Sequence, residues 1–156
     1  MSVPRPVLDE PVRAALDEIG HPLSIAASVR DQGGNLADFR LDFVNAAAAA
    51  WTRLPREAIV GRLASELLPA LRTSGLFDEL RRVVETGEPF RQAGVRFDDA
   101  EIDGQNVGGR FDMGALRLGD GYLSVWRDIG EGDSETEELD ASLRSARALI
   151  RLIRLE

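Results

Sequence analysis

Cysteine is absent from the 156-residue sequence. Its absence excludes disulfides, thiolate metal ligands, thiol nucleophiles and any cofactor attached through sulfur. Histidine occurs once, at His21, so a site built from several imidazoles is excluded as well. All 19 positively charged residues are arginine. Because no fold requires arginine over lysine, we interpret this choice, together with the alanine run, as the base composition of a bacterial genome of high GC content.

Long apolar runs are also missing. No segment approaches the roughly 18 to 20 apolar residues that span a bilayer, and the N-terminal MSVPRPVLDEPV lacks the basic and apolar regions of a signal peptide. The net charge of −8 disfavours nucleic acid as a direct partner, because phosphate binding needs clustered cations. We therefore expect a cytoplasmic protein that contacts neither membrane nor nucleic acid.

The stretch at residues 39–61 predicts a strand that runs directly into a helix. Apolar side chains alternate with polar ones up to Asn45, which suits the N-cap of the alanine-rich helix that follows. Pro55 ends this helix, because it disfavours helical backbone at the residue before it, and it suits the first turn of a second short helix that ends at Gly61. Farther on, residues 76–85 form the best amphipathic helix of the body, with Gly87 as its C-terminal glycine.

Strand patterns precede and follow these helices. Alternation predicts strands at residues 23–30, 39–44, 95–97, 110–118 and 122–129, the last two joined by the turn Gly119-Asp120-Gly121. The order favours an α+β fold, with a five-stranded antiparallel sheet and the helices on one face. We divide the chain into an N-terminal amphipathic helix (1–22), a sheet domain (23–130) and a linker with a C-terminal helix (131–156).

The two terminal helices carry candidate dimer contacts. Apolar residues of the tail are spaced four, three, four and three apart, which favours a self-associating coiled coil over a helix packed on its own domain. Strand parity predicts Trp126 on the outer sheet face, where it would meet the apolar stripe of residues 8–19 from its own chain or a partner's. The candidate interface comprises Leu8, Val12, Leu16, Ile19, Trp126, Leu139, Leu143, Ala146, Ile150 and Ile153.

Four motifs in order resemble a PAS domain across residues 23–129. FVNAAAAAW begins at Phe43, LPREAIVGR at Leu54, VVETGEPF at Val83 and WRDI at Trp126; Gly130 departs from the threonine that usually follows the last motif. The resemblance implies a non-catalytic sensor module of bacterial signalling proteins, which dimerises and relays a signal through its C-terminal helix to a downstream effector.

Within that family the sequence restricts the cofactor. The absence of cysteine excludes the flavin–thiol chemistry of the light-sensing branch and the thioester chromophore of the yellow-protein branch. Haem is disfavoured, because the resemblance would place its axial ligand on the helix at 76–85, which has no histidine. An alternative function is a sensor that binds flavin without a covalent bond, or a small apolar ligand.

The family's pocket lies between the sheet and the long helix. Its lining would comprise Trp51, Leu54, Phe77, Leu80, Val84, Val95, Phe97, Phe111, Met113, Leu123 and Val125. The competing interpretation, which we favour, is that these side chains simply fill the core.

A third, remote alternative is a small α+β-cone enzyme. Asp98, Asp99, Glu101 and Asp103 form an acidic cluster, but it lacks the ligand spacing of a calcium loop and has no catalytic partner. We expect a solvated polar loop, no metal site and no enzyme.

Overall fold

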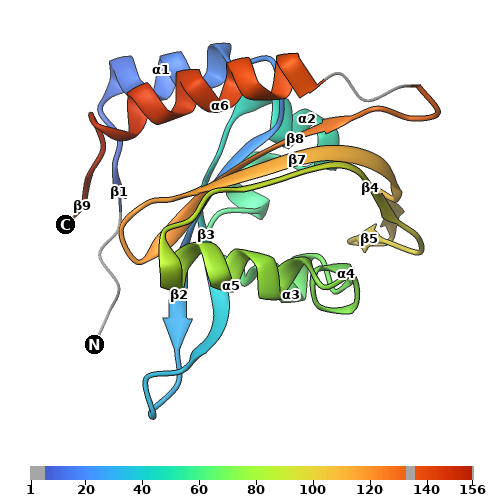
Figure 1. Cartoon of the computed structure of the whole chain (residues 1–156), viewed down its shortest axis with the longest axis horizontal. Helices are drawn as coiled ribbons and strands as arrows, with labels where there is room; N and C mark the ends of the chain where they lie inside the picture. The colour runs from blue at the N-terminus through green and yellow to red at the C-terminus, as the bar shows by residue number, and fades with distance from the viewer. Residues whose placement is uncertain (1–5, 133–135, 156) are drawn as a thin grey trace.

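A five-stranded antiparallel sheet forms the centre of the molecule (Figure 1). The computed structural model describes residues 6–132 and 136–155. The strands follow the spatial order β3-β2-β8-β7-β4, and every neighbouring pair is antiparallel. Their bounds are β2 Leu23–Arg30, β3 Leu36–Val44, β4 Phe90–Phe97, β7 Gly109–Arg117 and β8 Gly121–Asp128. The predicted α+β fold is confirmed.

Helices cover both faces of this sheet (Figure 1). The inner face carries the elements between β3 and β4: α2 (Ala46–Thr52), the 3-10 helix η1 (Arg56–Ala58), α3 (Ala64–Leu67), α4 (Ala70–Thr73) and α5 (Leu76–Thr86). The outer face carries α1 (Glu10–Glu18) and α6 (Thr136–Ile150), which lie side by side. Two short strands, β1 (Pro6–Val7) and β9 (Arg154–Leu155), pair with each other beyond the ends of these helices.

Two hydrophobic cores result, one on each face of the sheet. The inner core lies under α2–α5 and includes the fully buried Phe39 and Phe111. The outer core lies under α1 and α6 and includes Leu16, Leu123 and Leu139, each with no exposed surface. Burial on both faces gives β8 apolar side chains in both parities, so alternation alone does not say which set faces which core.

The parity predicted for β8 is wrong for this reason. Leu123 and Val125, expected to line the pocket, belong to the outer core. Trp126, expected outside, packs against the inner core and meets Trp51 at 5.4 Å between ring centroids. In β3 the bulge opposite Ile25 and Ala26 has a similar effect, because it turns Phe43 into the outer core, whereas Phe39 and Leu41 stay in the inner one.

The tail residues expected to form a coiled coil are buried within their own chain. Leu139 and Ala146 are fully buried in the outer core, Ile153 is nearly so, and Leu143 and Ile150 pack against it. The N-terminal stripe joins the same core through Val12, Leu16 and Ile19, with Leu8 packed against it. This structure therefore has the arrangement expected as the alternative, a helix packed on its own domain.

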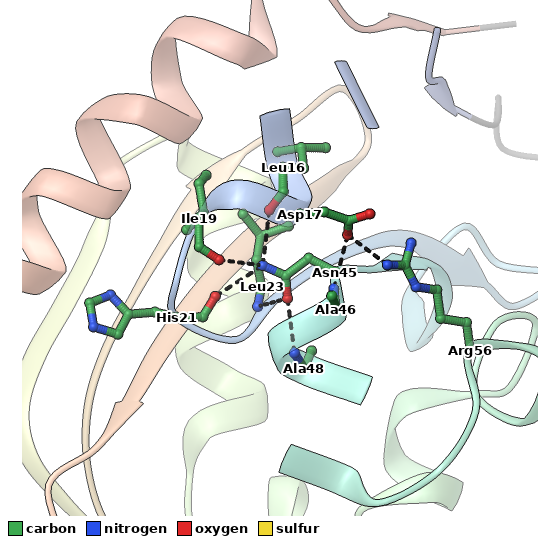
Figure 2. A network of polar contacts seen from close by, with 9 residues as sticks. All are labelled: Leu16, Asp17, Ile19, His21, Leu23, Asn45, Ala46, Ala48 and Arg56. Carbon is green, nitrogen blue, oxygen red and sulfur yellow. Dashed lines mark hydrogen bonds and ion pairs between the residues drawn. The ribbon is translucent and has the colours of Figure 1, made fainter. Parts of the chain in front are cut away.

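Asn45 ties three elements together at the start of α2 (Figure 2). Its side-chain oxygen accepts hydrogen bonds from the backbone N–H of Ala48, as the predicted N-cap should, and from that of Leu23 at the start of β2. Its side-chain amide donates to the carbonyls of Leu16, Ile19 and His21. Asn45 has no exposed surface, so these partners replace water completely.

Asp17 of α1 adds a second link at the same junction. Its carboxylate accepts a hydrogen bond from the backbone N–H of Ala46, the first residue of α2, and forms an ion pair with Arg56 at 2.7 Å (Figure 2). The carboxylate sits at the positive end of the α2 dipole, where a negative charge is favourable. The end of α1 is thereby fixed to the inner helices across the edge of the sheet.

One glycine is required by close packing between strands. A Cβ at Gly121 would lie 2.1 Å from the carbonyl oxygen of Ala26 on the neighbouring β2, which no side chain permits. The segment at residues 98–106, predicted to be a polar loop, contains the short hairpin β5 (Glu101–Ile102) and β6 (Gln105–Asn106). Ile102 is buried and anchors this hairpin to the inner core. No helix in the described residues is long and apolar enough to cross a membrane.

The Asn45 network makes a prediction that separates it from simple helix capping. Asn45→Asp preserves a good N-cap but places an oxygen against three carbonyls, so we expect a loss of about 2–4 kcal/mol in the free energy of unfolding, as for Asn45→Ala. Urea denaturation measures it, with exposed Asn35→Ala as a control that changes stability by less than about 0.5 kcal/mol. If Asn45→Asp is as stable as the wild type, the contacts of the amide with the three carbonyls contribute nothing to stability.

Candidate functional site

A cavity of about 110 Å³ lies between the inner face of the sheet and the helices α2–α5. Its sheet side is formed chiefly by Phe111, Met113, Ala115, Tyr122, Ser124 and Trp126. Its helix side is formed chiefly by Ala48, Trp51, Leu67, Leu71, Leu76 and Leu80. Ala100, Ile102 and Val107, from the segment around β5 and β6, also line it. The inner core is thus incompletely filled, contrary to the interpretation favoured from the sequence.

Aromatic rings enclose part of the cavity. Trp51 of α2 meets Phe111 of β7 and Trp126 of β8 edge to face, with centroid separations of 5.7 and 5.4 Å. Phe97 of β4 stands 5.8 Å from Phe111. Such edge-to-face contacts stabilise each pair by about 0.5–1.5 kcal/mol beyond the area they bury. The rings therefore stabilise one another along one wall of the cavity.

The cavity offers little polarity and no charge among its lining residues. Ser24 and Ser124, on β2 and β8, hydrogen-bond to each other at 2.7 Å. The Thr52 hydroxyl donates to the Ala49 carbonyl at 2.9 Å. These hydroxyls are partly satisfied inside the protein, so the cavity suits a small, neutral and mainly apolar molecule.

The structure brings together five of the eleven residues predicted to line the pocket: Trp51, Leu80, Phe97, Phe111 and Met113. Leu54, Phe77, Val84 and Val95 pack in or against the surrounding inner core without lining the cavity. Leu123 and Val125 lie on the other face of the sheet.

Sequence reasoning missed the contribution of the segment at residues 98–108. Ala100 and Ile102 are almost fully buried although acidic residues surround them. Their spacing of two, with Glu101 exposed between them, is the strand signal that would have identified them. The missed Tyr122, Ser124 and Trp126 follow from the parity of β8 described above.

The acidic residues of this segment are spread over its surface. Asp103 pairs with Arg62 through two hydrogen bonds of 3.0 Å, and these hold the pKa of Asp103 below its usual value. Asp98, Asp99 and Glu101 are exposed. Across residues 6–132 and 136–155 no group of three or more acidic or histidine side chains lies close enough to hold a metal.

Neither haem nor flavin fits the cavity. His21 lies in the outer layer, where its Nδ1 is 2.8 Å from the Ser142 hydroxyl of α6, so it does not reach the inner cavity as an axial ligand. A cavity of about 150 Å³ holds benzene in another protein. The 110 Å³ between these walls is smaller, and a three-ring flavin would have to displace Trp51 or Trp126.

Burial of Tyr122 in the cavity wall makes the free energy of unfolding depend on pH under alkaline conditions. Burial, with a smaller effect from Asp38, raises the pKa of the Tyr122 phenol above its usual value of about 10. The unfolded chain therefore loses this proton first as pH rises. The contribution of Tyr122 to the free energy of unfolding is therefore fully present below a pH of about 10. Above that pH it falls by about 1.4 kcal/mol per pH unit.

Tyr122→Phe should abolish that alkaline slope while changing stability little at neutral pH. The chain has one tyrosine and neither cysteine nor lysine, so few other groups titrate in this range. Unfolding free energies measured by denaturant titration between neutral pH and about pH 11.5 test this. An equal slope in Tyr122→Phe and the wild type would show that Tyr122 ionises freely in the folded protein.

The comparisons with known proteins agree with this geometry. The PAS fold family model matches residues 37–131, which is more than half of the chain. No curated protein is similar enough to be matched.

Solved structures share the fold at low identity. The Rhodobacter sphaeroides LOV protein aligns with a TM-score of 0.57 and 15% identity over 92% of this chain and 90% of that one. The PAS domain of nitrogen regulation protein NR(II) from Vibrio parahaemolyticus aligns with a TM-score of 0.54 and 16% identity, over 78% of this chain and 99% of that one. A domain of a sensory box sensor histidine kinase/response regulator from Geobacter sulfurreducens aligns with a TM-score of 0.51 and 22% identity, over 74% of this chain and 90% of that one. With its five-stranded sheet, its inner helices and the family model that spans them, the chain belongs to the PAS family.

Proposed function

We propose that this PAS domain is a sensory signalling module in which α6 is the output element. The observation that carries the proposal is the placement of two consecutive residues of β8. Trp126 lines the inner cavity, whereas Arg127 reaches the outer face and holds Glu138 of α6 at 3.1 Å. A shift of β8 at the cavity wall therefore acts directly on the docking of α6, through which the module would address a downstream effector.

Polar contacts fix α6 to the sheet at several points. Glu138 meets Arg127 and also lies 3.6 Å from His21 Nε2. The neighbouring turn of α6 places the Ser142 hydroxyl against His21 Nδ1. At the edge of the sheet, Asp140 accepts two hydrogen bonds from Arg91 of β4, at 2.6 and 3.0 Å. These partners come from β8, β4 and the loop after α1, so the position of α6 depends on the relative positions of all three.

A second contact, between α6 and the backbone of β7, connects α6 to a strand that lines the cavity. A Cβ at Gly114 of β7 would lie 2.6 Å from a methyl group of Leu143, so α6 lies almost directly on the backbone there. Met113, the preceding residue, lines the cavity and pairs with Trp126 in the sheet register. Because packed interfaces respond to small shifts by changing between discrete arrangements, movement of this strand pair would loosen or tighten α6.

A second candidate function, ligand binding, is supported by the cavity itself. Its apolar, uncharged lining and its aromatic wall suit a small neutral ligand, which would be the input signal for the α6 output. A ligand shifts the docking equilibrium only by the difference between its affinities for the two states. A ligand that contacts Met113 and Trp126 would have such a difference, because both strands also carry α6.

The docking proposal predicts the effect of removing one carboxylate. Glu138→Ala should raise the rate of amide hydrogen exchange in α6 about two- to fivefold, because a half-exposed ion pair and a histidine contact are lost. Glu131→Ala, in the exposed turn before α6, is the control and should leave exchange unchanged. Unaltered exchange in both variants would mean that the outer core alone holds α6.

The ligand proposal predicts that xenon, an atom smaller than benzene, binds inside the protein. At ten times its Kd, xenon should raise the free energy of unfolding by about 1.4 kcal/mol. Ala115→Leu puts three more carbon atoms into the cavity and should abolish this gain, whereas Ala93→Leu on exposed β4 should not. Amide hydrogen exchange in α6 should change with xenon in the wild type. Xenon stabilisation without any change in α6 would support the cavity and refute its coupling to the output.

A further inference from the structure

Residues 98–108, here called the flap, leave the sheet and return to it at one position. The flap follows Phe97 at the end of β4 and precedes Gly109 at the start of β7, and these two residues are partners in the strand register. Its hairpin β5–β6 is a separate two-stranded sheet at the end of β4 (Figure 1). A loop of this size with adjacent ends is a compact unit, and an isolated two-stranded hairpin is only marginally stable. The flap can therefore move about its ends without breaking the pairing of β4 with β7.

The two sides of the flap differ in chemistry. Ala100 and Ile102 are only 1% and 2% exposed, and together with Val107 they line the cavity. On the other side, Asp99 and Glu101 are exposed. The flap thus covers the cavity with apolar side chains and faces water with carboxylates. Because only these few apolar side chains would leave the core, opening of the flap would cost far less than unfolding of the domain.

Hydrogen bonds inside the flap hold its two arms together. The backbone N–H of Val107 donates to the Ala100 carbonyl at 2.9 Å, and the N–H of Gly108 donates to the side-chain oxygen of Asn106 at 2.8 Å. These bonds join residues of the flap to each other and not to the rest of the domain. They therefore persist when the flap opens, so that it moves as one body.

An ion pair, here called the latch, fastens the tip of the flap to the helix layer. Arg62 donates two hydrogen bonds of 3.0 Å to the carboxylate of Asp103, which lies in the turn between β5 and β6. The backbone of Arg62 is itself held, because its carbonyl accepts a hydrogen bond from the N–H of Leu41 in β3. Ile59 and Ala64, on either side of Arg62 in the chain, line the cavity. The two side chains of the latch are 35% and 41% exposed, so water competes for the contact and the latch breaks readily.

We propose that the flap opens to admit a ligand to the cavity, and that the latch between Arg62 and Asp103 sets how often it opens. The purpose of the opening rests on the proposed ligand binding, whereas the motion itself does not. The alternative is that the flap stays closed as part of the core, and that a ligand enters only when the domain unfolds. Because the closed state predominates with or without the latch, its loss should raise the rates of ligand entry and exit together and leave the affinity unchanged.

Xenon exchange measured by magnetisation-transfer NMR tests the opening. Asp103→Asn removes the charge and keeps a residue type that tolerates the left-handed backbone at this position, where φ is 48°. Asp103→Asn and Arg62→Gln should each raise the rate of xenon exchange about two- to fivefold, with an unchanged Kd. The double variant should exchange no faster than either single variant, because both remove the same contact. Glu101→Gln removes a carboxylate of the flap outside the latch, and this control should exchange as the wild type does.

Thiol labelling tests the motion without a ligand, since the chain has no cysteine of its own. Ala100→Cys puts a thiol on the buried side of the flap, and Ala146→Cys puts one in the outer core, where the side chain has no exposed surface. With dithiobis(nitrobenzoate) as the reagent, Ala100→Cys should react about tenfold faster than Ala146→Cys or more, because local opening exposes it. Adding Asp103→Asn should raise the labelling rate of Ala100→Cys about two- to fivefold and leave that of Ala146→Cys unchanged.

The two experiments separate the flap from the ligand. Latch-dependent labelling of Ala100→Cys in a protein that binds no xenon would support the motion of the flap and refute the ligand site. Xenon binding with the same exchange rate in the wild type and both latch variants would overturn the flap as the route of entry. Equal labelling rates of Ala100→Cys and Ala146→Cys would overturn its motion, because both thiols would then be exposed only by unfolding of the whole domain.

Discussion

The buried side chain of Asn45 is the constraint on which the arrangement of layers depends. Its oxygen and its amide together satisfy backbone groups at the end of α1, at the start of β2 and at the start of α2. An asparagine is required because only its amide offers two donors beside an acceptor of this size. The outer helix, the sheet and the first inner helix are therefore positioned by one residue, with Asp17 and Arg56 as a second tie.

Covering both faces of the sheet places the cavity and α6 on opposite sides of the same strands. β7 and β8 each line the cavity on one face and contact α6 on the other, as Trp126 and Arg127 of β8 do. A sheet with one solvated face would have no packed element to move on that side. The proposed relay requires that a disturbance at the aromatic wall moves the strands and not the side chains alone.

Local sequence rules determined the elements and the fold class. The N-cap at Asn45, the glycine at the end of α5 and the alternation in β2, β7 and β8 act between near neighbours in the chain, so they are readable without tertiary information. The family motifs follow the same elements. Five of the eleven residues predicted to line the cavity do line it, and those of α5, β4 and β7 follow from the periodic pattern of their elements.

The tertiary structure alone decided which face each doubly buried strand presents and what covers the tail helix. Leu123, Val125 and Trp126 are apolar in both parities, so only the packed helices distinguish inside from outside. The spacing of Leu139, Leu143 and Ala146 serves a coiled coil and a sheet surface equally well, because both need one apolar stripe. The sequence by itself determined the hydrophobic periodicity of each element and the caps of its helices. Long-range packing determined which elements cover each apolar face, because periodicity shows that a face is buried but not what buries it.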